Sequence, residues 1–167
     1  MENDRTILKA RAKRNAEKIA HIESLDSVYF LVFRVVKEIY AIENKWIKEV
    51  VKVSAFTTIP GTPDFVLGVA NIRGNIYSAI NINRFLSARE YGLSELNKLI
   101  IISNGDVEYG FVADEIMGFS ETRLSDISEV PDNYNQLYKE FVTGICKTGA
   151  LILNGKALTE SNKIIIE

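Results

Sequence analysis

Short apolar runs separated by polar breaks follow one another from residue 28 to the end of the chain, and this pattern predicts strands. The runs VYFLVFRV and EIYAI, which open the region, are rich in the β-branched and aromatic residues that strands favour. KLIIIS and VEYGFVADEIMGFSETRL continue the pattern, and FVTGICKTGALIL predicts a closing hairpin that turns near Thr148 and Gly149. Many short strands with turn signals between them indicate a barrel or a sandwich.

The middle of the chain carries the clearest alternation. NKWIKEVVKV predicts a helical turn that passes into a strand near Val50, and TTIPGTPDF predicts a turn region, because its prolines cannot continue a ladder. VLGVANI and NIYSAINI predict two strands around Arg73-Gly74. Isoleucines alternate there with Asn81 and Asn83, the period-two pattern of a half-buried strand, and a short helix is expected at residues 83–86.

Two further segments differ from this strand pattern. Asn104-Gly105 is the strongest hairpin signal in the chain, because a type I′ turn needs two residues with positive φ. Residues 125–140 are polar and predict a loop with a helical patch.

Residues 5–22 predict a basic helix, since alanine, lysine, arginine and glutamate are strong helix formers. Its apolar stripe contains Leu8, Ala12, Ala16, Ile19 and Ile22 at helical spacing. The stripe lacks large anchors, which argues against membrane binding. Two interpretations stay open: a solvated terminal helix, or a helix that docks on a partner.

Composition narrows the class of protein. Apolar residues make up 47% of the 167 residues, so the chain can form a core and is not expected to be disordered. The net charge of −2 gives no overall attraction to nucleic acid. The N-terminus has no apolar signal region, and no run approaches the length of a membrane span. We therefore expect a cytoplasmic protein without membrane insertion, and the single cysteine suits a reducing compartment.

Residues suited to catalysis or metal binding are scarce. His21 lies in the basic helix without neighbours that would make it a base or a ligand, and Cys146 lies in a predicted strand as a core residue. Asp114 and Glu115 are adjacent, so in a strand they would point to opposite faces and would not share a metal. No hydrolase, zinc-protease or P-loop motif is present. An enzyme is not expected, although a site made only of carboxylates and lysines stays open.

Binding is the remaining class of function. Glu49 and Arg73 are charged residues next to apolar strand positions, and an arginine can pair with a carboxylate to hold the shape of a hairpin. The alternative is two solvated surface charges, since an exposed pair contributes only about 0–1 kcal/mol.

The order of these segments resembles the CheW-like domain of bacterial chemotaxis coupling proteins. That family reads as a Tyr-x-Ile strand, a segment with Glu before an aliphatic residue, a proline-containing turn, an N-x-R-G hairpin and a V-D-E-V strand. The resemblance covers residues 27–158, and its most specific part is the run GVANIRG at residues 68–74. The matching residues are Tyr40, Ile42, Ile47, Glu49, Val50, Pro60, Pro63, Asn71, Arg73, Gly74, Gly110, Val112, Asp114 and Glu115.

The resemblance implies a mostly β fold: two small five-stranded SH3-like β-barrels that share a core, with an N-terminal helix and short connecting helices. It implies an adaptor without catalytic activity, cofactor or metal. Its partners would be the cytoplasmic tip of a methyl-accepting chemoreceptor, held in a groove between the barrels, and the regulatory domain of the chemotaxis histidine kinase. The partner-binding residues implied are Ile47, Glu49, Val66, Val69, Asn71, Arg73 and Gly74.

Within this frame we expect Glu49 and Arg73 to face each other, and Asn71 and Gly74 to shape the turn. Core packing is an equally good interpretation of Ile47, Val66 and Val69. The expected organisation is a basic extension at residues 1–26 and a CheW-like domain at 27–167, with two lobes divided near residues 87–97 and strands crossing between them.

One departure from the family concerns the closing element. Asn154-Gly155 stands where the family has an acidic or amide residue and then an aliphatic one, and glycine weakens both helix and strand. The chief alternative to an adaptor is an SH3-like or OB-like barrel that binds nucleic acid through the basic N-terminal helix. Phe30, Phe33, Tyr40 and Trp46 argue against it, because they lie in apolar runs expected in the core.

Overall fold

The structure is a computed structural model, in which residues 11–14, 26–87 and 97–165 are described. Residues 11–14 are helical and exposed, in agreement with the predicted basic helix. The rest of that helix, His21 included, lies outside the described residues.

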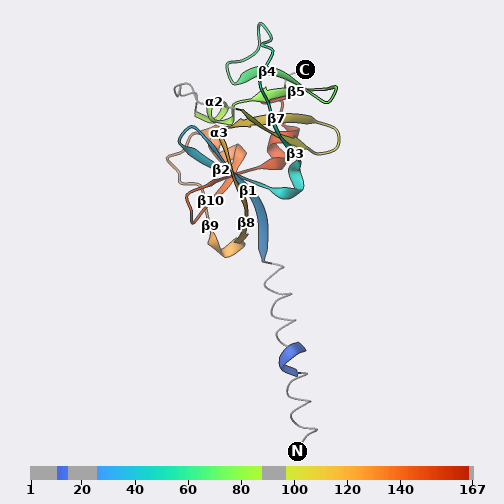
Figure 1. Ribbon diagram of the computed structural model, residues 1–167. Helices are drawn as coiled ribbons and strands as arrows, with labels where there is room; N and C mark the ends of the chain where they lie inside the picture. Colours follow the sequence, from blue (N-terminus) through green and yellow to red (C-terminus); the bar gives the residue numbers. More distant parts are fainter. Residues whose placement is uncertain (1–10, 15–25, 88–96, 166–167) are drawn as a thin grey trace, which may run out of the picture.

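Eleven strands in the described residues form two sheets. In Figure 1, β4 and β5 lie at the upper end of the body, and β8 and β9 lie at its lower end. Sheet A has the order β8-β1-β2-β11-β10-β9, and sheet B has the order β3-β6-β7-β5-β4. The strands of sheet A are β1 (Ser27–Val35), β2 (Glu38–Glu43), β8 (Glu115–Arg123), β9 (Ile127–Ser128), β10 (Val142–Cys146) and β11 (Leu151–Leu153). The strands of sheet B are β3 (Ile47–Lys52), β4 (Val66–Ile72), β5 (Asn75–Ile80), β6 (Lys98–Ser103) and β7 (Glu108–Ala113).

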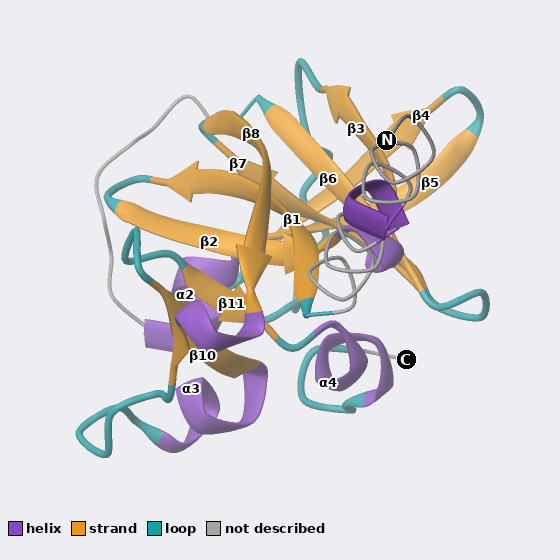
Figure 2. Cartoon of the chain, turned by 90° about the horizontal axis from the view of Figure 1, so that it is seen from below, coloured by secondary structure: helices purple, strands orange, loops and turns teal. Residues whose placement is uncertain are grey.

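Short helices connect the strands. Figure 2 shows α2 and α3 beside β10 and β11 of sheet A, and α4 on the same side of the molecule. The helical elements are η1 (Asn44–Trp46), α2 (Ile82–Ser87), η2 (Leu124–Asp126), α3 (Gln136–Phe141) and α4 (Gly155–Glu160). The helical turn before β3, the short helix after β5 and the helical patch within residues 125–140 are thereby confirmed.

One apolar core joins the two sheets. Phe33 and Tyr40 of sheet A are fully buried and pack in the same cluster as Ile100 and Phe111 of sheet B. Each sheet also encloses a smaller cluster of its own, around Leu99 in sheet B and around Phe30, Ala41 and Ile152 in sheet A. The predicted fold, two small barrels with a shared core, is confirmed. Sheet A has six strands because the two-residue strand β9 is added at its edge.

The two sheets use the chain unequally. Sheet B is built from the continuous segment 47–113, while sheet A takes its strands from both sides of it. The expected division near residues 87–97 does not coincide with a boundary between sheets, because β5 and β6 on its two sides both belong to sheet B. The division between an extension at 1–26 and a domain at 27–167 stays a prediction.

The asparagines after β5 are not outward-facing strand residues, so that part of the prediction is wrong. β5 ends at Ile80, and Asn81 and Asn83 are both buried. The Asn81 Oδ1 atom accepts hydrogen bonds from the backbone N–H groups of Asn83 and Arg84, both at 3.1 Å. Asparagine favours such caps because its side chain replaces a missing helical acceptor. The alternation therefore marks the start of α2.

The hairpin expected at Asn104-Gly105 forms, but not through a type I′ turn. Gly105 has a φ of 100°, whereas Asn104 is not among the residues with positive φ. β6 ends at Ser103 and β7 begins at Glu108, so the loop has more than two residues. The Asn104 Oδ1 atom accepts from the backbone N–H groups of Asp106 and Val107 instead. The side chain stabilises this longer loop.

The closing element forms in spite of its glycine. Asn154 caps α4, because its side chain accepts a hydrogen bond from the backbone N–H of Ala157 at 3.1 Å. A Cβ atom at position 155 would lie 2.3 Å from Cδ1 of Trp46. Gly155 therefore makes room for the indole ring, which explains the departure from the family pattern.

Asp114 anchors the turn between β1 and β2. Val36 in that turn has a φ of 58°, a strained conformation for a β-branched residue. Its N–H donates to Asp114 Oδ2, and its carbonyl accepts from Arg34 Nη1 at 3.0 Å. Asp114 lies where the chain passes from β7 in sheet B to β8 in sheet A. The match to the family's V-D-E-V segment thus has a structural cause.

We expect Asp114→Ala to lower the free energy of unfolding by about 2 kcal/mol, since it removes a charge-assisted hydrogen bond and leaves the Val36 N–H unpaired. Thermal unfolding followed by circular dichroism would measure this. Asp114→Asn keeps an acceptor and should recover most of the loss. Glu115→Ala is the matched control, because its ion pair with Arg34 is exposed and should cost less than about 1 kcal/mol. Equal losses at positions 114 and 115 would contradict this role.

Candidate partner-binding surface

The tip of the β4–β5 hairpin is a two-residue turn made by Arg73 and Gly74. Ile72 pairs with Asn75 on its two sides. Arg73 has a φ of 52° and Gly74 a φ of 90°, so both central residues are positive, as a type I′ turn requires. Asn71 supports the turn, because its Oδ1 atom accepts from the Gly74 N–H at 2.9 Å. Asn71 and Gly74 do shape the turn, as expected.

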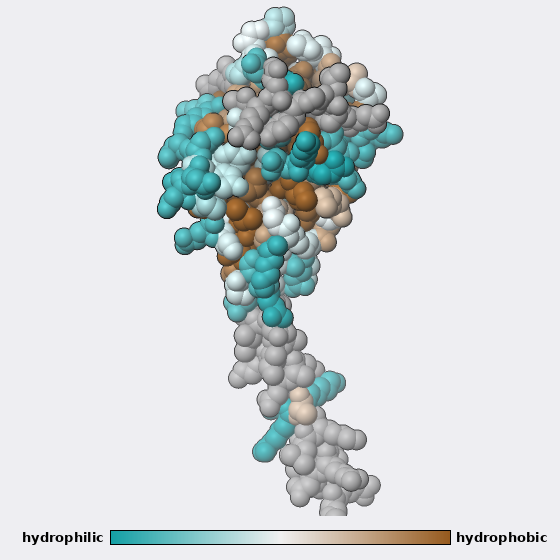
Figure 3. Space-filling model, turned by 90° about the vertical axis from the view of Figure 1, so that its left-hand side faces the viewer, coloured by the Kyte–Doolittle hydropathy of each residue, from teal (hydrophilic) through white to brown (hydrophobic). Residues whose placement is uncertain are grey.

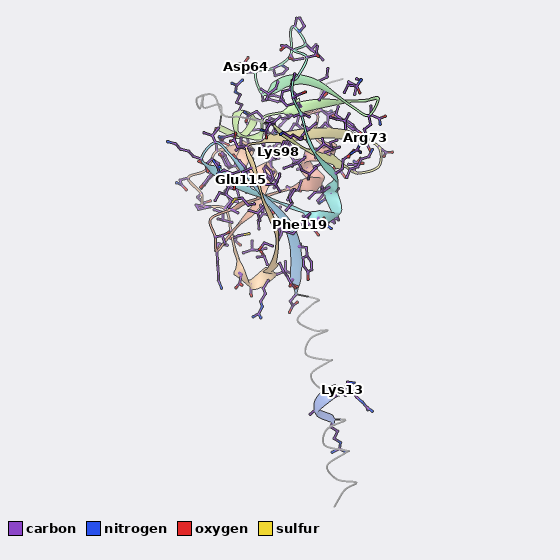
Figure 4. The ribbon with its side chains drawn as sticks, in the orientation of Figure 1. Lys13, Asp64, Arg73, Lys98, Glu115 and Phe119 are labelled. Atoms are coloured by element: carbon purple, nitrogen blue, oxygen red, sulfur yellow. The ribbon has the colours of Figure 1, made fainter. Side chains whose placement is uncertain are left out.

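Arg73 pairs with Glu49, as predicted. The Arg73 Nη1 atom lies 2.8 Å from Glu49 Oε2, and the side chains are 75% and 26% exposed. β3, which carries Glu49, and β4 are the two edge strands of sheet B. The ion pair therefore spans the seam at which the sheet curls into a barrel. Figure 4 shows Arg73 at the side of the molecule, on the hairpin.

A backbone contact closes the same seam. Thr57, in the segment after β3, exchanges two hydrogen bonds with Val69 of β4, at 2.8 and 2.9 Å. Gly68 lies beside this bridge with a φ of 136°, and a Cβ atom there would lie 2.2 Å from the Thr57 carbonyl oxygen. The first glycine of GVANIRG is thus required by a close approach of two backbones.

The three apolar residues predicted to bind a partner are half-buried strand residues, unlike the exposed hairpin tip. Ile47 is half-buried, packs against the shared core and pairs with Ile102. Val66 and Val69 are half-buried within β4. The structure therefore joins Glu49, Asn71, Arg73 and Gly74 into one charged tip, while Ile47 is mainly a packing residue.

A second ion pair lies on the neighbouring face of β3. Lys48 Nζ lies 2.7 Å from Glu108 Oε2, and it also donates to the Tyr77 hydroxyl at 3.3 Å. The hydrogen bond from Lys48 lowers the pKa of the Glu108 carboxyl. Lys48 and Glu108 neutralise each other, as Arg73 and Glu49 do. The Arg73 side chain is distinguished by its greater exposure, 75% against 41% for Lys48.

An exposed apolar surface on sheet A was missed from the sequence. Tyr29 of β1 is 56% exposed, and Met117 and Phe119 of the edge strand β8 are 51% and 62% exposed. Phe119 pairs with Leu31 and Glu121 pairs with Tyr29, so Tyr29 and Phe119 are diagonal neighbours on one face. We call Tyr29, Met117 and Phe119 the β8 surface. The signal that could have revealed it is EIMGF, which is apolar on both faces of a strand.

Tyr29 lies opposite Glu121 on this surface. The negative charge of Glu121 raises the pKa of the Tyr29 hydroxyl, and the hydrogen bond with Glu121 acts in the same direction. Figure 4 shows Phe119 in the lower part of the body, away from Arg73. Figure 3 views the body from the left-hand side of Figure 1 and shows apolar atoms among polar ones on that face. Exposed apolar side chains that lie together, such as Tyr29, Met117 and Phe119, mark surfaces that bind other proteins.

The residues considered for catalysis or metal binding do not lie together in one site. Cys146 is buried, and burial raises the pKa of its thiol. Asp114 and Glu115 have different partners, Val36 and Arg34. Within the described ranges, no three His, Cys, Asp or Glu residues form a group that could hold a metal ion. Phe30, Phe33 and Tyr40 are buried as expected and Trp46 is half-buried, so the first three offer no platform for bases.

No helix in the described part of the chain is both long enough and apolar enough to cross a membrane.

Comparison with known proteins gives one consistent result. Residues 29–163 match the family model of the CheW-like domain. Chemotaxis protein CheW of Bacillus subtilis is 28% identical over 124 residues, which cover 74% of this chain and 80% of that protein. Chemotaxis protein CheW of Helicobacter pylori is 28% identical over 142 residues, 83% and 86% of the two chains. The crystal structure of the scaffolding protein TtCheW from Thermoanaerobacter tengcongensis is similar with a TM-score of 0.68 and 27% identity, over 81% and 90% of the chains.

Proposed function

This chain belongs to the family of CheW-like domains, and from that premise we propose that it is a cytoplasmic chemotaxis adaptor without catalytic activity. It couples the cytoplasmic tips of methyl-accepting chemoreceptors to the regulatory domain of the chemotaxis histidine kinase. The relatives named as chemotaxis proteins and the related scaffolding protein support the coarser part of this function, a chemotaxis scaffold.

The hairpin tip is the observation that carries the proposal. Arg73 adopts positive φ, which costs roughly 1–2 kcal/mol for a residue with a side chain. The Arg73 side chain is 75% exposed, so its pair with Glu49 contributes little to stability. Backbone strain held in place by its surroundings at an exposed side chain is typical of functional sites. The tip therefore supports a role in binding, with Glu49 fixing the direction in which Arg73 is presented.

The β8 surface supports the second contact, with the receptor. Receptor tips are helical, and helices bind to protein surfaces through apolar anchors. Tyr29, Met117 and Phe119 form an exposed apolar surface, and Ile116 beside them packs against the shared core. This core also contains residues of sheet B. A helix docked on the β8 surface would therefore contact one barrel and, through Ile116, affect the packing of side chains shared with the other. Signalling then requires that these contacts differ between the two receptor states.

Titration calorimetry tests the function. The protein is titrated with the regulatory domain of the kinase from the same organism, and separately with a helical fragment of a receptor tip. Saturable binding to each partner is expected. Failure of both titrations would refute the adaptor. Salt-sensitive binding to random oligonucleotides would favour nucleic acid instead, because phosphate contacts weaken as salt rises.

We expect Phe119→Asp to weaken binding of the receptor fragment by about tenfold or more, since it places a charge where an apolar anchor docks. The affinity for the kinase regulatory domain should change less than about twofold, because substitutions at distant sites act independently. Ile59→Asp is the matched control, an exposed apolar residue in the loop before β4. Unchanged receptor binding by Phe119→Asp would exclude the β8 surface as the receptor site.

A further inference from the structure

A groove bordered by β1, η1, η2 and β11 is used by neither of the surfaces above. It encloses about 530 Å³, within the range of protein binding sites. Trp46 forms one wall, with its indole ring against Gly155. The apolar lining includes Val28, Phe30, Trp46, Leu124, Ile127 and Ile152. We call this the Trp46 groove.

The chain itself enters the described body at the rim of this groove. The Asp26 carbonyl accepts a hydrogen bond from the Leu124 N–H at 2.8 Å. Leu124 lines the groove, and so does Val28, two residues further along the chain. Whatever precedes Asp26 is therefore tethered directly beside this apolar surface.

The preceding segment has the composition to fill it. Residues 15–25, NAEKIAHIESL, place Ile19 and Ile22 at the i, i+3 spacing of one helix face, and Leu25 follows three residues later. As a helix, eleven residues would span about 16 Å. A short tether gives such a segment an effective concentration of about millimolar, so even a few apolar contacts would hold it.

Charges at the rim favour this occupant over a polyanion. The rim carries Glu43, Lys45, Glu129 and Lys156, two of each sign. Residues 15–25 also carry both signs, in Glu17, Lys18 and Glu23. A nucleic-acid groove would instead be lined by basic residues.

We propose that residues 15–25 of the same chain dock in the Trp46 groove through Ile19 and Ile22. The groove is then an intramolecular site that holds the basic N-terminal region against sheet A. This inference does not depend on the partners proposed above, because the occupant and the groove belong to one chain.

The test uses the full chain and its only tryptophan. Trp46 emission and its quenching by acrylamide are measured in the wild type, in Ile19→Asp/Ile22→Asp, and in His21→Asp/Ser24→Asp. The last variant adds the same two charges on the opposite helix face. Docking predicts a red shift and an increase in the quenching constant of about twofold for the isoleucine variant alone. A synthetic peptide of residues 1–26, added at millimolar concentration, should restore the shielding.

Equal quenching in all three proteins would overturn the proposal. So would a Trp46 that becomes shielded only when the kinase regulatory domain or the receptor fragment is added, because the groove would then belong to a partner. Thermal unfolding of each protein checks that the body is intact, and the peptide titration reports on the groove separately from the substitutions.

Discussion

Reversing the charge in Arg73→Glu is expected to weaken binding to the kinase regulatory domain or the receptor fragment by about tenfold or more, equivalent to roughly 1.4 kcal/mol. The substitution removes the presented guanidinium and places a carboxylate opposite Glu49, across the seam of sheet B. The fold should survive, because an exposed ion pair contributes only about 0–1 kcal/mol to stability. Titration calorimetry measures the affinity, and thermal unfolding confirms the fold.

A double-mutant cycle separates the pairing from the charge itself. Adding Glu49→Arg to Arg73→Glu restores an attractive pair with opposite polarity, and we expect it to recover part of the lost affinity. Lys147→Glu is the matched control, since Lys147 is 73% exposed and its partner Asp126 is 32% exposed. That reversal should change affinity less than about twofold. Absence of any recovery would show that the Glu49 contact does not position Arg73 for binding.

Gly68→Ala is expected to be the most destabilising single substitution proposed, at about 3 kcal/mol or more. The added Cβ would lie 2.2 Å from the Thr57 carbonyl oxygen, and neither backbone can withdraw without breaking the Thr57–Val69 bridge. The φ of 136° adds strain for any residue with a side chain. The midpoint of thermal unfolding should fall by about 6–12 °C.

Gly61→Ala supplies the control for backbone strain alone. Gly61 also has positive φ, at 82°, but no atom lies within 4 Å of its ideal Cβ position. We expect it to cost about 1 kcal/mol. If both substitutions cost the same, the close approach at Thr57 has no energetic weight. If only Gly68→Ala reduces partner binding at temperatures where it is folded, the seam also positions the hairpin.

The strands were predictable because their apolar patterns are local. The failures came from asparagines and glycines, whose effect depends on the neighbours that the fold supplies. Asn81 resembled an outward strand residue and caps α2, while the type I′ turn formed at Arg73-Gly74 and not at Asn104-Gly105. An arginine with positive φ is not a local preference. It becomes tolerable where Asn71 binds the turn and Glu49 binds the side chain.

The candidate site shows the same limit. The pair of Glu49 and Arg73 followed from a family resemblance, because nothing in spacing places residues 24 positions apart at opposite edges of a curled sheet. The β8 surface was missed because an apolar strand residue is assigned to the core by default. Only the position of β8 at a sheet edge leaves Phe119 exposed.

The unequal use of the chain by the two sheets has a consequence for synthesis on the ribosome. β2 pairs in parallel with β11, and Tyr40 lies opposite Leu151. Sheet A therefore cannot be completed until residue 151 has been synthesised. Sheet B, built from residues 47–113, can assemble while the C-terminal strands are still being made. Until then β1 and β2 are an incomplete half-sheet with an unpaired edge, the kind of species that aggregates or requires a chaperone. A nascent chain of this protein is therefore most vulnerable after sheet B has assembled and before β11 has left the ribosome.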